Sequence, residues 1–136
     1  MDKDVIISLC GRPGAAESIE LVTPGRYCKK DGKYFITYEE SSLTGMEGTT
    51  TTLQVEGKKV TLTRTGQNNS QMIFEVGKKH ISCYETPFGA IVVGVQAKNI
   101  AVDINECGGE ISAGYMLEVD NDLIGNSDFH MRIREA

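Results

Sequence analysis

Residues 108–119 read GGEISAGYMLEV, and an apolar side chain recurs at every second position from Ile111 to Val119. A period of two is typical of a β-strand with one buried face, because successive side chains of a strand point to opposite faces. The same alternation is seen in three other stretches: Tyr34, Ile36 and Tyr38; Met72, Phe74 and Val76; and Phe129, Met131 and Ile133. The chain is therefore predicted to consist of strands that direct one face at a core.

Breaks rich in glycine, asparagine and aspartate separate ten predicted strands. Their spans are 4–11, 17–30, 33–43, 49–55, 58–65, 70–76, 79–86, 90–107, 110–120 and 123–134. Two of the breaks, Asp31-Gly32 and Gly108-Gly109, suit the positive φ angles of tight hairpin turns. Hairpins are predicted there and at Glu56-Gly57 and Gly77-Lys78, and the two longest spans are predicted to bend near Pro24-Gly25 and Lys98-Asn99.

The arrangement predicted for these strands is all-β. No helical pattern separates them, so neighbours are expected to pair antiparallel in chain order. An open meander would leave exposed edges that invite aggregation, and closure removes those edges. We therefore predict an up-and-down antiparallel β-barrel of about eight to ten strands, rather than a two-sheet sandwich, as a single domain over residues 1–136.

Composition narrows the class of protein. The formal net charge is −5, which argues against a nucleic-acid binder or an anionic-membrane binder. The short apolar run at residues 5–9 follows two acidic residues and does not resemble a secretion signal, and no apolar run is long enough for a membrane helix. A cytoplasmic location is expected, with the four dispersed cysteines reduced and buried.

Three stretches carry a resemblance to a known family. They are Tyr38-Glu39-Glu40, the run from Gly45 to Leu53, and Tyr84-Glu85-Thr86-Pro87-Phe88-Gly89, followed by residues 109–117. Together they resemble the YwiB-like family, a bacterial domain of unknown function, over about residues 4–134. The resemblance implies a calycin barrel, the superfamily of lipocalin-like and fatty-acid-binding-like proteins, and it supplies no catalytic residues.

Two ligand motifs of the better-known calycins are absent from the sequence. The chain has no tryptophan, so it lacks the Gly-x-Trp motif of lipocalins. The last predicted strand reads HMRIR at residues 130–134, without the Arg-x-Tyr clamp of fatty-acid binders. A retinol-type or fatty-acid-type ligand would therefore rest on fold analogy alone.

The alternation also predicts charged residues inside the barrel. Tyr34, Ile36 and Tyr38 place Glu40 on their face, and Val60 with Leu62 places Arg64 on theirs. Arg64 is predicted to be shielded beside Tyr38, Glu40 or Tyr84. These four residues are either an internal ion-pair cluster or a ligand site in which Arg64 anchors an anion.

Other chemistry finds little support in the sequence. His80 and Cys83 fall on opposite faces of a strand, and two histidines cannot build a multi-histidine metal site. We therefore expect no metal and no cofactor. The alternative is a haem held by a single histidine, His80 or His130. His80 and Ser82 share a face but lie too far apart for a catalytic pair, so an enzyme is the least favoured class.

Two functions remain for the predicted barrel. The leading hypothesis is a cytoplasmic barrel that binds a small anionic or amphipathic ligand in its interior. The alternative is a packed barrel that acts as a protein–protein interaction module. Eight of the nine lysines flank connections predicted to meet at one barrel end, which would suit an acidic protein partner. The oligomeric state is left open.

Overall fold

The computed structural model describes residues 2–12, 19–40, 47–66, 69–86 and 89–136, although the side chains of residues 12, 19 and 84–86 lie outside this description. Ten strands make up the fold: β1 (Asp2–Arg12), β2 (Ile19–Lys30), β3 (Lys33–Glu39), β4 (Thr49–Glu56), β5 (Lys59–Gly66), β6 (Ser70–Phe74), β7 (Lys79–Thr86), β8 (Gly89–Asn105), β9 (Gly108–Val119) and β10 (Asp122–Glu135). The described residues contain no helix long and apolar enough to cross a membrane.

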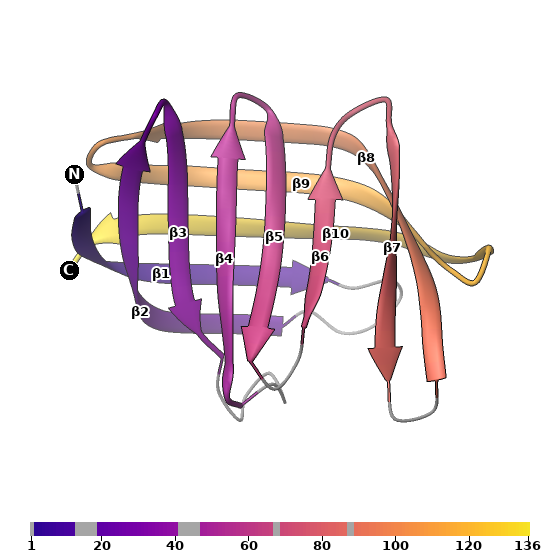
Figure 1. Cartoon of the computed structure of the whole chain (residues 1–136). Helices are drawn as coiled ribbons and strands as arrows, with labels where there is room; N and C mark the ends of the chain where they lie inside the picture. The colour runs from indigo at the N-terminus through magenta and orange to yellow at the C-terminus, as the bar shows by residue number, and fades with distance from the viewer. Residues whose placement is uncertain (1, 13–18, 41–46, 67–68, 87–88) are drawn as a thin grey trace.

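The ten strands form one antiparallel sheet in the order β6-β5-β4-β3-β2-β1-β10-β9-β8-β7. Pairing of β1 with β10 joins the two ends of the chain, and the sheet curls into a nearly closed barrel (Figure 1). The predicted fold class, an up-and-down antiparallel barrel, is confirmed. The sheet remains open along one seam between β6 and β7.

Two long strands bend, and they let the sheet wrap around its core. In Figure 1, β1, β8, β9 and β10 run across the strands of the other layer, and β2 passes from one layer to the other. The first part of β2 pairs with β1 and its last part, from Arg26, also pairs with β3. A register shift between Ala97 and Asn99 marks the bend of β8. Both bends were predicted by the sequence.

Two predicted hairpins need correction. Gly77-Lys78 connects β6 to β7, yet the described residues of these strands form no ladder, because Val76 leaves the strand to bridge Ala97 of β8. The turn between β8 and β9 lies at residues 106–107, since Asn105 pairs with Gly108. The Asp31-Gly32 turn has the expected positive φ angles of 53° and 77°.

The core is apolar and continuous. Fully buried side chains come from most of the strands and include Val5, Ile7, Ile36, Val60 and Ile111. Phe74 of β6 packs edge-on against Tyr115 and Phe129 of the opposite layer, with ring centroids 4.9 and 5.4 Å away. The expectation of buried thiols is wrong, because Cys10, Cys83 and Cys107 are exposed, although all four cysteines are free.

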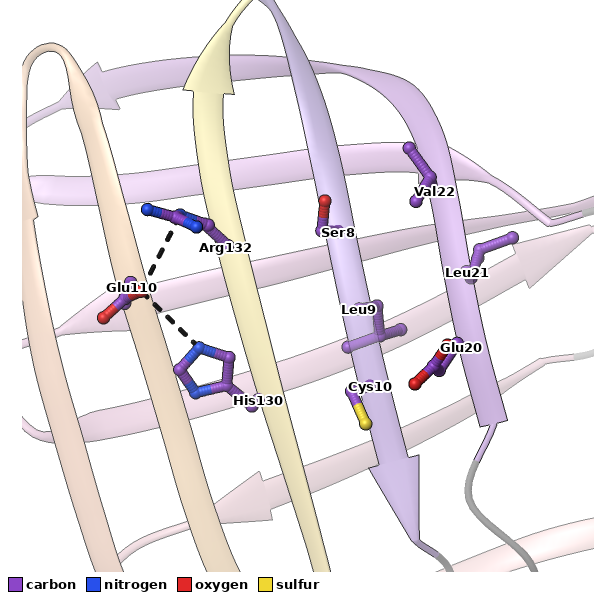
Figure 2. Close-up of a pocket in the computed structure, with 9 residues that line it drawn as sticks. All are labelled: Ser8, Leu9, Cys10, Glu20, Leu21, Val22, Glu110, His130 and Arg132. Carbon is purple, nitrogen blue, oxygen red and sulfur yellow. Dashed lines mark ion pairs between the residues drawn. The ribbon is translucent and has the colours of Figure 1, made fainter.

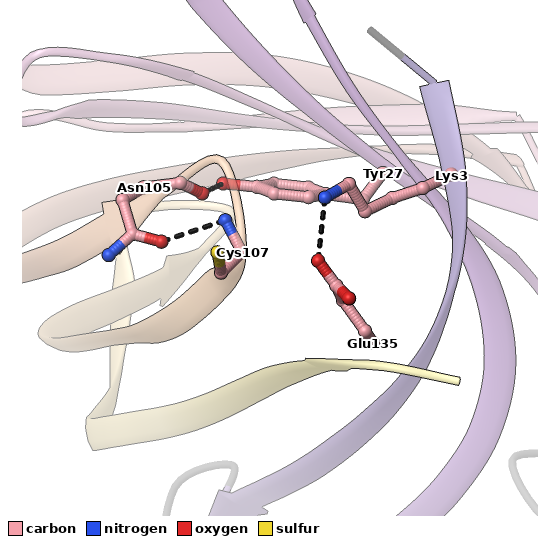
Figure 3. A network of polar contacts seen from close by, with 5 residues as sticks. All are labelled: Lys3, Tyr27, Asn105, Cys107 and Glu135. Carbon is pink, nitrogen blue, oxygen red and sulfur yellow. Dashed lines mark hydrogen bonds and ion pairs between the residues drawn. The ribbon is translucent and has the colours of Figure 1, made fainter.

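One end of the barrel is closed by polar contacts across its opening (Figure 3). The buried Tyr27 ring stacks on Tyr34 with centroids 5.5 Å apart, and its hydroxyl donates to the carbonyl of Asn105 at 2.6 Å. Beside it, the Lys3 ammonium contacts the Glu135 carboxylate at 2.7 Å. This closed end contains the chain termini and the turn between β8 and β9.

Candidate functional site

The predicted charged residues meet on the inner face, away from the closed end. Cross-strand pairing puts Tyr38 of β3 opposite Thr51 of β4, and Thr51 opposite Arg64 of β5. One step further along, the amide of Glu40 donates to the carbonyl of Thr49 at 2.8 Å. Alternation along three adjacent strands therefore assembles a polar cluster of Tyr38, Glu40, Thr51 and Arg64 inside an apolar barrel.

Glu40 is the buried acid of this cluster. Its side chain is 1% exposed, and the Thr51 hydroxyl donates to Glu40 Oε1 at 2.6 Å. The adjacent Glu39 is exposed on the outer face, as the alternation predicts. A carboxylate removed from water in this way needs such donors and a nearby cation to remain charged.

Arg64 supplies the nearby cation, but the contact is long. Arg64 Nε lies 3.9 Å from Glu40 Oε1, beyond hydrogen-bond distance, and the Arg64 side chain is 22% exposed. Nε is shielded from solvent and has no hydrogen-bond partner among the described residues. The Arg64 side chain is thus only partly shielded as a whole, and its Nε is a donor without an acceptor among the described residues.

Tyr38 completes the cluster as a neutral donor. Burial raises the pKa of its phenol well above the ordinary value, and the neighbouring Glu40 carboxylate raises that pKa further, while Arg64 opposes the shift. The phenol is therefore protonated at neutral pH. At neutral pH the four side chains contribute one positive and one negative charge.

The apolar surface next to Arg64 is incompletely covered. Leu62, two residues before Arg64 on β5, faces Met72 of β6, and both side chains are partly exposed. Leu9 and Phe129, toward the same barrel end, are also partly exposed inner-face residues. At the closed end, Tyr34 and Ile104 are partly exposed as well. Arg64 therefore borders apolar inner surface that solvent can reach.

Sequence reasoning missed Thr51 and Thr49, and the predicted position of Tyr84 is not tested. The four-threonine run at residues 49–52 suggests a solvated strand, yet Thr49 and Thr51 are 1% and 0% exposed. Counting back by twos from the core residues Leu53 and Val55 would have found them. The backbone of Tyr84 pairs with Ile91 in β7, but its side chain lies outside the described residues.

A surface depression, separate from the Arg64 cluster, lies on the outer face of β2, β1, β10 and β9 (Figure 2). It has a volume of about 290 Å³ and is lined by residues that include Cys10, Val22 and Glu20. One acid lies near its two basic side chains, because His130 Nε2 and Arg132 Nε are both 3.7 Å from Glu110 Oε1. Arg132 is 67% exposed, so this outer site gives an anion less shelter than Arg64.

The histidines and lysines lie elsewhere. His80 Nε2 is 3.1 Å from Glu75 Oε1, and His130 is on the outer face. No cluster of three or more His, Cys, Asp or Glu side chains within the described ranges could hold a metal ion.

The β2–β3, β4–β5 and β6–β7 turns share one edge in Figure 1, and exposed lysines flank them: Lys29, Lys30, Lys58, Lys59, Lys78 and Lys79.

Comparison with known proteins agrees with this barrel. Residues 7–132 match a family described as "Domain of unknown function (DUF1934)". The chain is 29% identical over 109 residues to the uncharacterized beta-barrel protein YwiB of Bacillus subtilis (strain 168), covering 80% of this chain and 75% of that protein. The crystal structure of the B. subtilis ywiB protein superposes with a TM-score of 0.80 at 19% identity, over 99% of this chain and 93% of that one.

Proposed function

The chain belongs to the DUF1934 family, and because that description assigns no activity, we propose from the site itself that this barrel binds a small amphipathic anion in its interior. Arg64 holds the anionic group, and the apolar body lies against inner-face residues such as Leu62 and Met72. We place this activity in the cytoplasm, as the sequence leads us to expect.

One observation carries the proposal: Arg64 Nε is shielded from solvent, yet it has no hydrogen-bond acceptor among the described residues. A buried donor without a partner costs about 1 to 3 kcal/mol. Two carboxylate or sulfonate oxygens match the planar fork of a guanidinium, so an anion would relieve this cost with good geometry. Glu40 Oε1, which lies 3.9 Å from Nε, is too far away to accept that hydrogen bond.

The apolar neighbours favour an amphipathic ligand over a bare inorganic anion. Ligand sites in barrels are lined mostly by apolar side chains with a few polar groups that fix orientation. Here the polar cluster occupies one row of the inner face, and Leu62 and Met72 form the next row. A ligand with its charge at one end and an apolar body at the other would contact both rows.

The proposal is tested with 1-anilinonaphthalene-8-sulfonate, a fluorescent amphipathic anion. We expect saturable fluorescence enhancement with the wild type and at least about tenfold weaker binding by Arg64→Met, which keeps the apolar stem but removes the charge. Arg132→Met, on the outer face, is the matched control and should bind like the wild type. Circular dichroism verifies that each variant is folded. Equal binding by wild type and Arg64→Met would refute the proposal.

The alternative function, docking of an acidic protein, is favoured by the exposed lysines around the three turns. Part of this charge is compensated, since Lys33, Lys78 and Lys79 contact Glu56, Glu75 and Glu118. Salt-dependent binding of poly-L-glutamate, lost when Lys58, Lys59, Lys78 and Lys79 are replaced by Glu but kept in Lys98→Glu, would support it. Native mass spectrometry of protein from its own host separates a copurifying small molecule from a recurring protein partner.

A further inference from the structure

The seam between β6 and β7 leaves each of these strands with one unpaired edge, because they are the two end strands of the sheet. Among the described residues, β6 forms a ladder only with β5, and β7 forms one only with β8. Figure 1 shows β6 and β7 joined by a short turn at one end and lying further apart at the other. An unpaired strand edge is a template for another strand, and most proteins cover or disrupt such an edge.

The backbone groups that β7 presents at this edge follow from the pairing of β8. The amide of Asp120 donates to the carbonyl of Val92 at 2.7 Å, so the backbone groups of Val92 point away from β7. Val92 lies opposite Cys83, and residues in an antiparallel ladder alternate between hydrogen-bonded and non-hydrogen-bonded pairs. The N–H and C=O groups of Cys83 and Ile81 are therefore directed at the open seam, where no described residue bonds to them.

The side chains beside these backbone groups are apolar and exposed. Ile81 is 65% exposed and lies opposite Gly94 of β8, which has no side chain to cover it. Cys83 is exposed too, and Val92 opposite it is 41% exposed. The next residue of β8, Val93, belongs to the core, so these side chains share the outer face. A strand added to β7 would cover apolar surface as well as pair its backbone.

One end of the β7 edge is basic. Four lysines lie at the turns that precede β5 and β7, which share one edge of the barrel in Figure 1: Lys58, Lys59, Lys78 and Lys79. Glu75 contacts Lys78, and Glu118 contacts Lys79. Lys58 and Lys59 have no ion-pair partner within the described ranges, so this end remains positively charged. An antiparallel strand on β7 would bring its C-terminal part to this end.

We propose that the open edge of β7 binds one extended peptide segment as an added antiparallel strand. The segment carries apolar side chains at alternate positions, opposite Cys83 and Ile81, and acidic side chains toward its C-terminal end, opposite Lys79. A second copy of this chain fits less well, because its own β7 would arrive with its β8, in the place that β6 occupies beyond the seam. This inference goes beyond the anion site and does not rest on it.

The probe is a fluorescently labelled peptide in which valine alternates with threonine and glutamates close the C-terminal end. We expect it to bind the intact wild-type protein saturably, measured by fluorescence anisotropy. N-methylation of the valines removes the amide hydrogens that would bond to the carbonyls of Ile81 and Cys83, and it should weaken binding at least about tenfold. Equal binding of the N-methylated peptide would overturn the proposal, because backbone pairing would then not contribute.

A third peptide, with lysines in place of the glutamates, tests the charge of the partner. At low salt we expect it to bind at least about tenfold more weakly than the glutamate peptide does, because the lysines of the barrel repel it. Equal affinity for both peptides would overturn the assignment of an acidic partner.

The matched protein variants are Ile81→Pro and Ile81→Thr. Proline removes the N–H that faces the seam without removing a hydrogen bond to β8, a position at which edge strands tolerate proline. Threonine retains that N–H and is β-branched like isoleucine. We expect Ile81→Pro to bind the glutamate peptide at least about tenfold more weakly than Ile81→Thr, with folding verified by circular dichroism. Equal binding by the two variants would overturn the proposal, and the N-methylated peptide decides the question on the wild type if Ile81→Pro does not fold.

Analytical ultracentrifugation without peptide tests the other occupant of the edge. We expect the wild type and Ile81→Pro to have the same oligomeric state, because the edge of β7 is free. A wild-type dimer that Ile81→Pro dissociates would overturn the proposal, since a second copy would then cover this edge.

Discussion

The hydroxyl of Tyr27 donates to the backbone carbonyl of Asn105 across one end of the barrel, at 2.6 Å. The two residues are 78 positions apart in the chain, and they join the end of β2 to the end of β8. Because Tyr27 is fully buried and stacked on Tyr34, this contact closes the barrel opposite the Arg64 cluster. Ligand entry is therefore expected at the Arg64 end.

Tyr27→Phe tests the strength of this closure. The variant keeps the ring and its packing but removes the hydroxyl that donates to the Asn105 carbonyl. We expect the free energy of unfolding to fall by about 1 to 2 kcal/mol in urea titrations followed by circular dichroism. Tyr34→Phe, whose ring remains available for stacking, is the control and should cost less. Equal losses in both variants would contradict the importance of the Asn105 contact.

Gly25 is a second position where a small substitution is expected to destabilise the fold. A Cβ there would overlap Ile7 Cδ1 and lie 2.7 Å from the Thr37 carbonyl oxygen, where β2 bends between the layers. We expect Gly25→Ala to destabilise the protein by about 1 to 3 kcal/mol, as overpacked core sites do. Gly11→Ala is the matched control, because its Cβ would meet nothing nearer than 3.9 Å. If Gly25→Ala left the free energy of unfolding unchanged, the backbone at this bend would be able to shift at little cost.

The sequence predicts the barrel well because its strands alternate cleanly and its turns are rich in glycine. Alternation alone placed Glu40 and Arg64 on the inner face, since a side-chain period of two leaves little choice. It could not foresee the open seam, because Gly77-Lys78 resembles the other turns and only Val76 pairing with Ala97 diverts the chain. The polar inner residues Thr49 and Thr51 escaped notice because a run of threonines has no hydrophobic alternation.

Thr51 and Thr52 offer a direct comparison of the two faces of β4. Thr51 is fully buried and donates to the Glu40 carboxylate at 2.6 Å, whereas the partly buried Thr52 hydroxyl meets Thr37 at 3.3 Å. Valine has the same shape without the hydroxyl and suits a strand equally well. Thr51→Val should cost about 1.5 to 3 kcal/mol because it removes a hydrogen bond to a charged group, and Thr52→Val should cost less than about 1 kcal/mol. If Thr52→Val lowered the free energy of unfolding more than Thr51→Val does, Thr51 would not be the donor that stabilises the buried Glu40 carboxylate.

The buried phenols of Tyr27 and Tyr38 should make the free energy of unfolding depend on pH in alkali. Burial raises the pKa of both phenols above the ordinary value of 10.0, so the folded protein keeps two protons that the unfolded chain releases above about pH 10. Because the unfolded state then binds fewer protons, the free energy of unfolding falls as the pH rises, by about 1.4 kcal/mol per pH unit for each tyrosine. Below about pH 9 neither phenol contributes to this slope.

The measurement compares urea unfolding of the wild type and Tyr38→Phe between about pH 9 and about pH 11. Phenylalanine cannot ionise, so the free energy of unfolding of the variant should fall by about 1.4 kcal/mol less per pH unit than that of the wild type. The lysines are common to both proteins, so their contributions cancel in the difference. Near-ultraviolet absorbance provides a second check, because the phenolate signal of the two buried tyrosines should rise only as the chain unfolds. Phenolate formation at Tyr38 in the folded barrel, read from the difference between the two proteins, would show that water reaches the inner face beside Glu40.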